Sequence, residues 1–194
     1  YTQIGGGYAV SKGPRINLVS SVTIPADYNG LPVTEILMGA FENSTTLTEL
    51  RLPDSLLRIA ADTAFAGCTN LTSVEVYASG KSGARYSSAD GVLFDSGDSV
   101  TPHAPRPVFM PVAKTGTYTV PGGVDVIPRS AFAGSKLSKI ILPVSVKEIG
   151  VEAFANCTEL TSVTFEEAGA TNGVAGLTIG DRAFLGCEKL AVLT

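Results

Sequence analysis

The feature that most constrains this chain is an internal repeat built around the dipeptide Ala-Phe. Five similar segments contain it, AFENSTTL, AFAGCTNL, AFAGSKL, AFANCTEL and AFLGCEKL, with the phenylalanines at 41, 65, 132, 154 and 184. Phe41 and Phe65 are 24 residues apart, and Phe132 and Phe154 are 22 apart. A period of roughly 20–50 residues indicates a stacked array of structural units. We therefore expect a repeat solenoid.

Each Ala-Phe segment is followed by the pattern of a short β-strand. A leucine comes first, and apolar and polar residues then alternate in LTELRL, LTSVEV, LSKIIL and LTSVTF. Alternation with a period of two predicts a strand with one buried face. Pro25, Pro53, Pro121 and Pro143 are expected to end such strands, because proline cannot donate to a sheet ladder.

A second apolar element precedes each phenylalanine, at Ile36, Ile59, Ile127, Ile149 and Ile179. One coil therefore consists of a strand, a proline, a second short strand and the Ala-Phe turn. A single coil cannot bury its apolar face alone, so stability must come from stacking against neighbouring coils.

Residues 142–163, LPVSVKEIGVEAFANCTELTSV, resemble the consensus LPxSVxxIGxxAFxxCxxLxxV of the BspA-like, treponemal class of bacterial leucine-rich repeats. The resemblance covers about 22–76 and 119–194, and VTIPADYNGLPVTEI at 22–36 is similar to the family's N-terminal pattern. It implies a right-handed leucine-rich-repeat coil with a parallel β-sheet and short helical or 3-10 turns. It also implies a secreted or cell-surface bacterial protein, and it carries over no catalytic residue.

We expect one leucine-rich-repeat domain over 1–194. A cap-like segment covers 1–35, repeats cover 36–76 and 122–194, and a degenerate repeat covers 77–121. The degenerate repeat contains DGVLF and YTVP, which resemble a hairpin-bearing segment of the family, and a polar, proline-rich loop is expected at 95–107. Two departures from the repeat are expected to bulge: the extra residue in LLRIAADTAF at 56–65 and the insertion EEAGATNGVAGL at 166–177.

The composition argues against a nucleic-acid partner and against a membrane span. The chain is 44% apolar and 16% charged, its net charge is -4, and it has no run of Lys or Arg. Nucleic acid is therefore not an expected partner, because no basic patch could neutralise phosphates. No apolar stretch approaches the ~18 residues that a membrane span needs. The sequence begins at Tyr1 without an initiator Met, as removal of a signal peptide or of another upstream segment would leave it. The family resemblance implies an extracellular or cell-surface location.

No catalytic, metal or cofactor site is predicted. His103 is the single histidine and lies in the 95–107 loop, with no nucleophile or orienting residue beside it in the sequence. Catalytic triads are spatial, so a hydrolase that uses this loop is an alternative. The run from Asp95 to Asp98 resembles the start of a calcium loop, but Arg106 stands where the bidentate glutamate belongs, and we predict a turn.

The three cysteines occupy one register of the repeat, three residues after a phenylalanine. Cys68, Cys157 and Cys187 alternate at this register with Ser44 and Ser135. Exchange with serine predicts a small, buried spacer that is not a reactive thiol. A disulfide between Cys157 and Cys187, which lie in consecutive coils, is the alternative.

Strand parity predicts which side chains face outward. If Leu50 and Leu52 point inward, the equivalent outward positions form a ladder on the open sheet, the usual binding surface of a solenoid. The candidate ligand-binding residues are Glu49, Arg51, Ser73, Glu75, Lys139, Ile141, Ser162 and Thr164.

These observations favour a non-catalytic extracellular module of a bacterium that binds a protein or glycan ligand of a host or matrix and acts in adhesion. Besides the hydrolase, a purely structural spacer for another domain is an alternative. The chain stops at Thr194 inside a strand of its last repeat, where arrays need a polar cap. We therefore expect either a missing cap or an end-to-end dimer through the C-terminal repeat.

Overall fold

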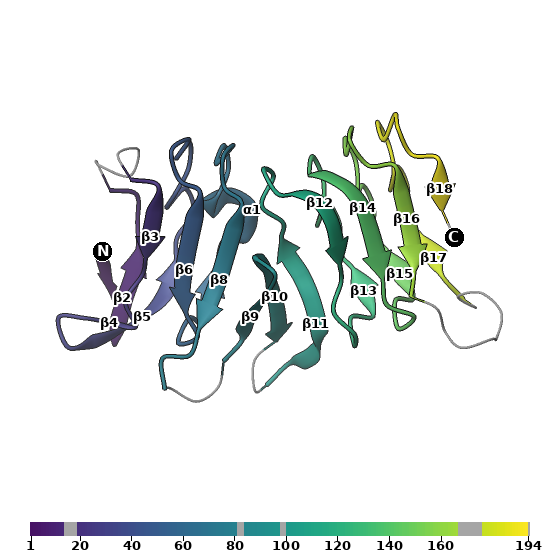
Figure 1. Cartoon of the computed structure of the whole chain (residues 1–194). Coiled ribbons are helices and arrows are strands. Elements are labelled where there is room, and N and C mark those ends of the chain that lie inside the picture. Colours follow the sequence, from purple (N-terminus) through teal and green to yellow (C-terminus); the bar gives the residue numbers. More distant parts are fainter. Residues whose placement is uncertain (14–18, 81–83, 98–99, 167–175, 194) are drawn as a thin grey trace. The chain divides into compact units, whose positions relative to one another are not determined.

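The computed structural model describes residues 1–13, 19–80, 84–97, 100–166 and 176–193. The chain divides into two compact units, Tyr1–His103 (unit 1) and Ala104–Thr194 (unit 2). Each unit consists of coils whose strands lie side by side (Figure 1). This confirms the repeat solenoid that the Ala-Phe period predicts.

Unit 1 contains two sheets and a hairpin. The first sheet is parallel and has the order β3-β6-β8, with bounds Ser21–Thr23, Glu49–Pro53 and Ser73–Tyr77. The second has the order β1-β2-β5-β4 with β7 beside β5, and its strands are Thr2–Ile4, Gly7–Val10, Leu31–Ile36, Asp27–Tyr28 and Arg58–Ile59. The antiparallel hairpin is formed by β9 (Tyr86–Ala89) and β10 (Val92–Gly97).

Unit 2 contains two parallel sheets, one on each side of the coils. One has the order β12-β14-β16-β18, with bounds Thr115–Thr119, Lys136–Leu142, Ser162–Phe165 and Val192–Leu193. The other has the order β13-β15-β17, with bounds Val126–Ile127, Glu148–Ile149 and Thr178–Ile179. Strand β11 (Pro102–Phe109) begins in unit 1 and continues in unit 2.

The core of each unit is a column of stacked rings from the repeated phenylalanine. In unit 1 the ring centroids of Phe41 and Phe65 are 5.8 Å apart. In unit 2 the Phe132 and Phe154 centroids are 5.2 Å apart, and those of Phe154 and Phe184 are also 5.2 Å apart with an interplanar angle of 1°. One coil therefore delivers one ring to the column.

Two left-handed backbone corners flank most of these phenylalanines. Two residues after the ring, the φ angle is positive in all five coils, at Asn43, Gly67, Gly134, Asn156 and Gly186. Asparagine and glycine tolerate this conformation best. Two residues before the ring, φ is positive at Gly39, Ser130, Glu152 and Arg182.

Backbone hydrogen bonds join neighbouring coils at these corners as well as in the sheets. The amide of Phe154 donates to the carbonyl of Ala183 at 2.8 Å, and Asn156 donates to Leu185 at 2.6 Å. On another side of the coil, the amide of Gly150 donates to Ile127 at 2.8 Å. The corners therefore satisfy backbone groups that a buried turn would otherwise leave unpaired.

The departures from the repeat differ in part from expectation. The segment 56–65, which has one extra residue, contains the one-turn helix α1 (Ala61–Ala64) where a bulge was expected. The expected 95–107 loop is wrong, because β10 continues to Gly97 and β11 begins at Pro102. Most of the 166–177 insertion, at 167–175, lies outside the described residues.

Gly150 lies against the backbone of the preceding coil, so a larger residue there should destabilise the fold. A Cβ atom there would lie 2.7 Å from the amide nitrogen of Arg129 and 2.9 Å from the carbonyl carbon of Pro128, both backbone atoms of the preceding coil. We expect Gly150→Ala to lower the unfolding free energy of the chain by about 1–3 kcal/mol, because the coils must separate.

Gly122→Ala is the matched control in the same unit. A Cβ atom at Gly122 meets nothing within 4 Å, and its φ is not in the left-handed region. Urea unfolding followed by circular dichroism should show a change within about 0.5 kcal/mol for this control. Equal midpoints for the two variants would contradict the close approach.

Candidate functional site

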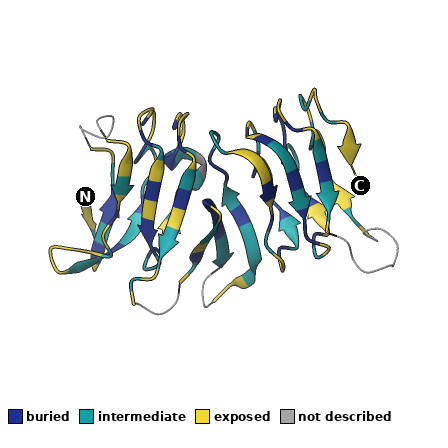
Figure 2. Ribbon diagram, in the orientation of Figure 1, coloured by how far each residue is buried: buried dark blue, intermediate teal, exposed yellow. Residues whose placement is uncertain are grey.

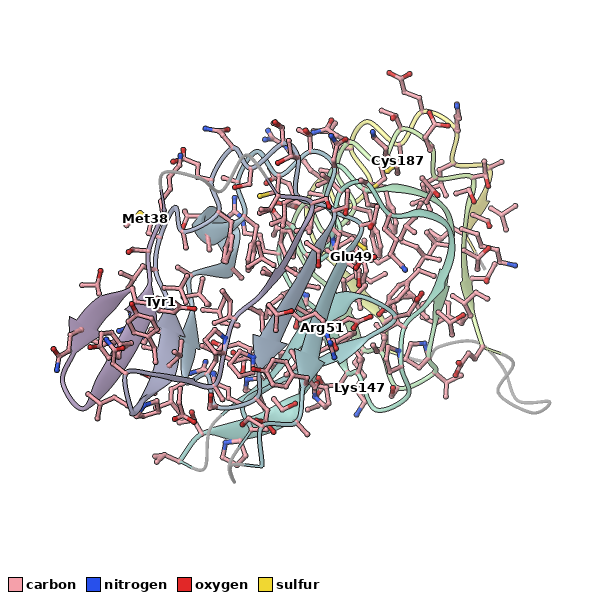
Figure 3. The ribbon with its side chains drawn as sticks, turned by 60° about the vertical axis from the view of Figure 1, so that its left-hand side comes forward. Tyr1, Met38, Glu49, Arg51, Lys147 and Cys187 are labelled. Carbon is pink, nitrogen blue, oxygen red and sulfur yellow. The ribbon has the colours of Figure 1, made fainter. Side chains whose placement is uncertain are left out.

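The outward side chains of β3, β6 and β8 form the unit 1 face. The parallel register aligns Ser21 with Glu49 and Ser73, and Thr23 with Arg51 and Glu75. Between them, Leu50, Leu52 and Val74 are fully buried. Figure 2 shows the resulting alternation of buried and exposed bands along β6, and Figure 3 shows Glu49 and Arg51 in succession along that strand.

Arg51 is the centre of the unit 1 face. Its Nε lies 3.7 Å from Oε2 of Glu75, and the two side chains are 52% and 58% exposed. Its guanidinium carbon lies 5.8 Å from the centroid of the Tyr77 ring. The Tyr77 hydroxyl donates to the carbonyl of Ile24 at 2.8 Å, which fixes the ring at the end of β8. The face therefore offers a cation and a carboxylate beside an oriented aromatic ring.

Ser73 is less available than strand parity suggests. A Cβ atom at Gly91, in the turn of the β9–β10 hairpin, would lie 2.7 Å from the Ser73 Oγ. The amide of Val74 donates to the carbonyl of Gly91 at 2.8 Å, and that of Val76 donates to Oγ of Ser88 at 2.8 Å. The hairpin therefore covers the edge of the unit 1 sheet at β8.

The outward side chains of β12, β14, β16 and β18 form the unit 2 face. The register aligns one row across the four strands and a second row across three of them. Ile140, Leu142 and Val163 between them are fully buried. The rows consist of Thr117, Lys139, Ser162 and Val192, and of Thr119, Ile141 and Thr164.

The two faces differ in chemistry. The unit 1 face carries Glu49, Arg51 and Glu75, whereas Lys139 is the one charged member of the two unit 2 rows. Hydroxyl groups dominate the second face, so it offers neutral donors and acceptors.

The eight candidate residues lie in these rows, and strand parity omits several residues of the same rows. Thr23 is followed by one inward residue and then by Pro25. Thr119 is followed in the same way by one inward residue and Pro121. The same proline signal that ends β6 and β14 could have extended the ladder to them. Tyr77 follows directly after the repeated segment LTSVEV. No repeated pattern in the sequence marks it as part of the face.

His103 does not lie in an open loop. It is on β11, and its Nε2 lies 4.0 Å from Oδ1 of Asp95. That carboxylate accepts hydrogen bonds from Nε of Arg85 at 3.0 Å, from Nη2 of Arg85 at 2.8 Å and from the amide of Gly97 at 2.7 Å. The geometry makes Asp95 a structural anchor of the hairpin. Asp98, the other aspartate of the suggested calcium loop, lies outside the described residues.

The cysteines are spacers of the interior, as their register predicts. Cys68 and Cys157 are buried and Cys187 is half-buried. Each thiol donates to the carbonyl of the phenylalanine of the preceding coil, at 3.0 to 3.1 Å. Burial raises the pKa of all three thiols, which disfavours the nucleophilic thiolate.

The described residues contain neither a cluster of metal ligands nor a membrane-spanning helix. No three His, Cys, Asp or Glu side chains within them are grouped closely enough to hold a metal ion. Within the same part of the chain, no helix has the length and apolar character that crossing a bilayer requires.

Comparison with known proteins places this geometry among bacterial leucine-rich repeats. The family model described as a BspA type leucine rich repeat region (6 copies) matches residues 17–87. No curated protein matches the chain. A leucine rich cell surface protein from Faecalibacterium prausnitzii A2-165 is 25% identical with a TM-score of 0.56, over 90% of this chain and 53% of that protein.

Two further solved structures share the fold. The leucine rich repeat protein of T. pallidum is 21% identical with a TM-score of 0.54, over 96% of this chain and 84% of that one. A leucine-rich repeat protein from Bacteroides ovatus ATCC 8483 is 22% identical with a TM-score of 0.56, over 98% of this chain and 43% of that one. The chain thus spans about half the length of the Faecalibacterium and Bacteroides proteins.

The alternation along β6 predicts opposite outcomes for adjacent substitutions. We expect Leu50→Ala to lower the unfolding free energy by about 2–5 kcal/mol, because a fully buried leucine leaves a cavity. Arg51→Ala should change it by at most about 1 kcal/mol, because the pair with Glu75 is exposed to solvent. Urea unfolding of both variants checks this, and a large loss for Arg51→Ala would mean that the unit 1 face is part of the core.

Proposed function

We propose that this chain, a BspA-type leucine-rich repeat protein, is a non-catalytic module that binds a protein or glycan ligand outside a bacterial cell. The observation that supports the proposal most directly is the separation of the two kinds of side chain on each strand. Inward residues are fully buried, while outward residues form ordered rows on the unit 1 and unit 2 faces. A solenoid uses such open sheets for recognition.

The proposed contact residues are the eight outward residues that strand parity selects. On the unit 1 face, Arg51 and Glu75 present a donor and an acceptor beside the fixed ring of Tyr77. On the unit 2 face, Lys139 and Ile141 stand among hydroxyl groups. Arginine and tyrosine are side chains that contribute strongly to binding energy at protein interfaces. The likeness to a cell surface protein of Faecalibacterium supports the proposed location.

A binding panel tests this function. The chain is applied to immobilised extracellular-matrix proteins and to immobilised glycans, and we expect retention on at least one of them. Arg51→Ala or Lys139→Ala should then weaken binding at least tenfold, because each removes a charged contact of its face, while thermal stability stays within a few degrees.

Lys147→Ala is the matched control for Lys139→Ala in unit 2. Lys147 is exposed but precedes β15 in the other sheet, away from the unit 2 rows. It should leave binding unchanged. If no ligand on the panel is retained, the binding role fails and a spacer role is favoured. If all three variants weaken binding equally, the faces are not the contact surface.

We also propose that the 194-residue chain associates end to end through its C-terminal repeat. The last coil exposes the apolar side chains of Ile179, Leu185, Val192 and Leu193. Burial of such side chains against a second copy would remove apolar surface from water.

Leu185→Asp and Leu57→Asp form a matched pair, because both leucines are 55% exposed. Sedimentation velocity over a range of concentrations should show a dimer for the unsubstituted chain and for Leu57→Asp. Leu185→Asp should be monomeric, since a charge would be buried at the contact. A monomer for the unsubstituted chain at every concentration rules out this association.

A further inference from the structure

Two thiols of the interior occupy the same register in consecutive coils of unit 2. Cys157 and Cys187 are both free, and each occupies the position three residues after a stacked phenylalanine. The Cys187 thiol donates to the carbonyl of Phe154 at 3.0 Å, and the Cys157 thiol donates to that of Phe132 at 3.1 Å. The backbone beside them is joined directly, because the amide of Asn156 donates to the carbonyl of Leu185 at 2.6 Å, and each thiol affects the pKa of the other.

We propose that Cys157 and Cys187 are an oxidative modification site, where a small-molecule disulfide such as oxidised glutathione converts the thiol pair into an intramolecular disulfide that staples the last two coils. The spacing of the coils fits this bond. Neighbouring parallel strands lie about 4.7–4.9 Å apart. The Cα atoms of a disulfide are roughly 4.4–6.8 Å apart, so the coils need only a local adjustment.

The two cysteines differ in access, which sets the order of the reaction. Cys157 is fully buried, whereas Cys187 is half-buried, and Leu185 and Val192 near it in the sequence are exposed. Figure 3 labels Cys187 among the yellow and green loops of unit 2. The reagent therefore meets Cys187 first, and Cys157 reacts in the second step.

The electrons and protons balance over two exchanges. The Cys187 thiolate attacks one sulfur of oxidised glutathione, and one glutathione leaves as its thiolate. The Cys157 thiolate then attacks the Cys187 sulfur, and the second glutathione leaves. Two protein thiols are oxidised by two electrons, one small disulfide is reduced to two thiols, and the two released thiolates take up the two protein protons. Burial raises the pKa of both cysteines, so the rate should increase from pH 7 to pH 9.

Cys68 supplies an internal control within the same chain. Its thiol donates to the carbonyl of Phe41 at 3.0 Å, which is the same arrangement as in unit 2. The residue at this register in the neighbouring coil, however, is Ser44, so no second thiol stands there. Cys68 therefore shares the register and the burial of the proposed site but lacks a second cysteine beside it. The site requires two cysteines in neighbouring coils.

The test treats the folded 194-residue chain with oxidised glutathione at pH 8.5 and analyses it by intact mass and tryptic mapping. We expect a loss of about 2 Da, a link between tryptic peptides 148–182 and 183–189, and an unmodified Cys68. Hydrogen exchange of amides in 176–193 should slow at least about tenfold, because the staple suppresses opening of the last coil.

Three variants separate the site from general thiol chemistry. Cys157→Ser should give only a glutathione adduct on Cys187, and serine already occupies this register at Ser44 and Ser135, so the fold is kept. Cys187→Ser should give no reaction in unit 2, while Cys68→Ser should leave the cross-link intact. Adducts on Cys187 without a cross-link in the unsubstituted chain, or a disulfide between two molecules, would overturn the proposal.

Discussion

The structure depends on one constraint: besides the short turn bonds within each coil, the backbone of a coil is hydrogen-bonded to the coils beside it. The sheets supply part of this ladder, and the Ala-Phe corners supply the rest, as in the bonds from Phe154 to Ala183 and from Asn156 to Leu185. Register must therefore be kept all the way around the coil. The stacked rings and the shared position of the cysteines follow from this requirement, since these residues lie beside their equivalents in the neighbouring coil.

Much of this fold could be predicted from the sequence because its signals are local and repeated. Alternation assigns the inward residues of β6 and β14, prolines mark where strands end, and the exchange of serine with Cys157 and its equivalents marks a buried spacer. The asparagines and glycines two residues after each phenylalanine also carry a readable signal, because these residue types favour a positive φ.

Other features could not be read from the sequence. Ser130, Glu152 and Arg182 adopt a positive φ although their side chains do not favour it, because the coil on either side imposes the corner. Ser73 is covered by the turn at Gly91, a contact between segments with no shared pattern. The pairing of Arg85 with Asp95 likewise arises only once the hairpin has formed. These are consequences of tertiary packing, and periodicity contains no information about them.

The coil-to-coil ladder also determines how unit 2 would respond to a pulling force. A load along the stack opens the hydrogen bonds between two coils in succession, like a zipper, because the strands lie across the direction of pull. The coil between Phe132 and Phe154, when it detaches, releases the 22 residues that separate these rings. At about 3.3–3.6 Å per extended residue, that amounts to roughly 70–80 Å of slack. Such a stack would lengthen in unequal steps, because Phe154 and Phe184 are 30 residues apart.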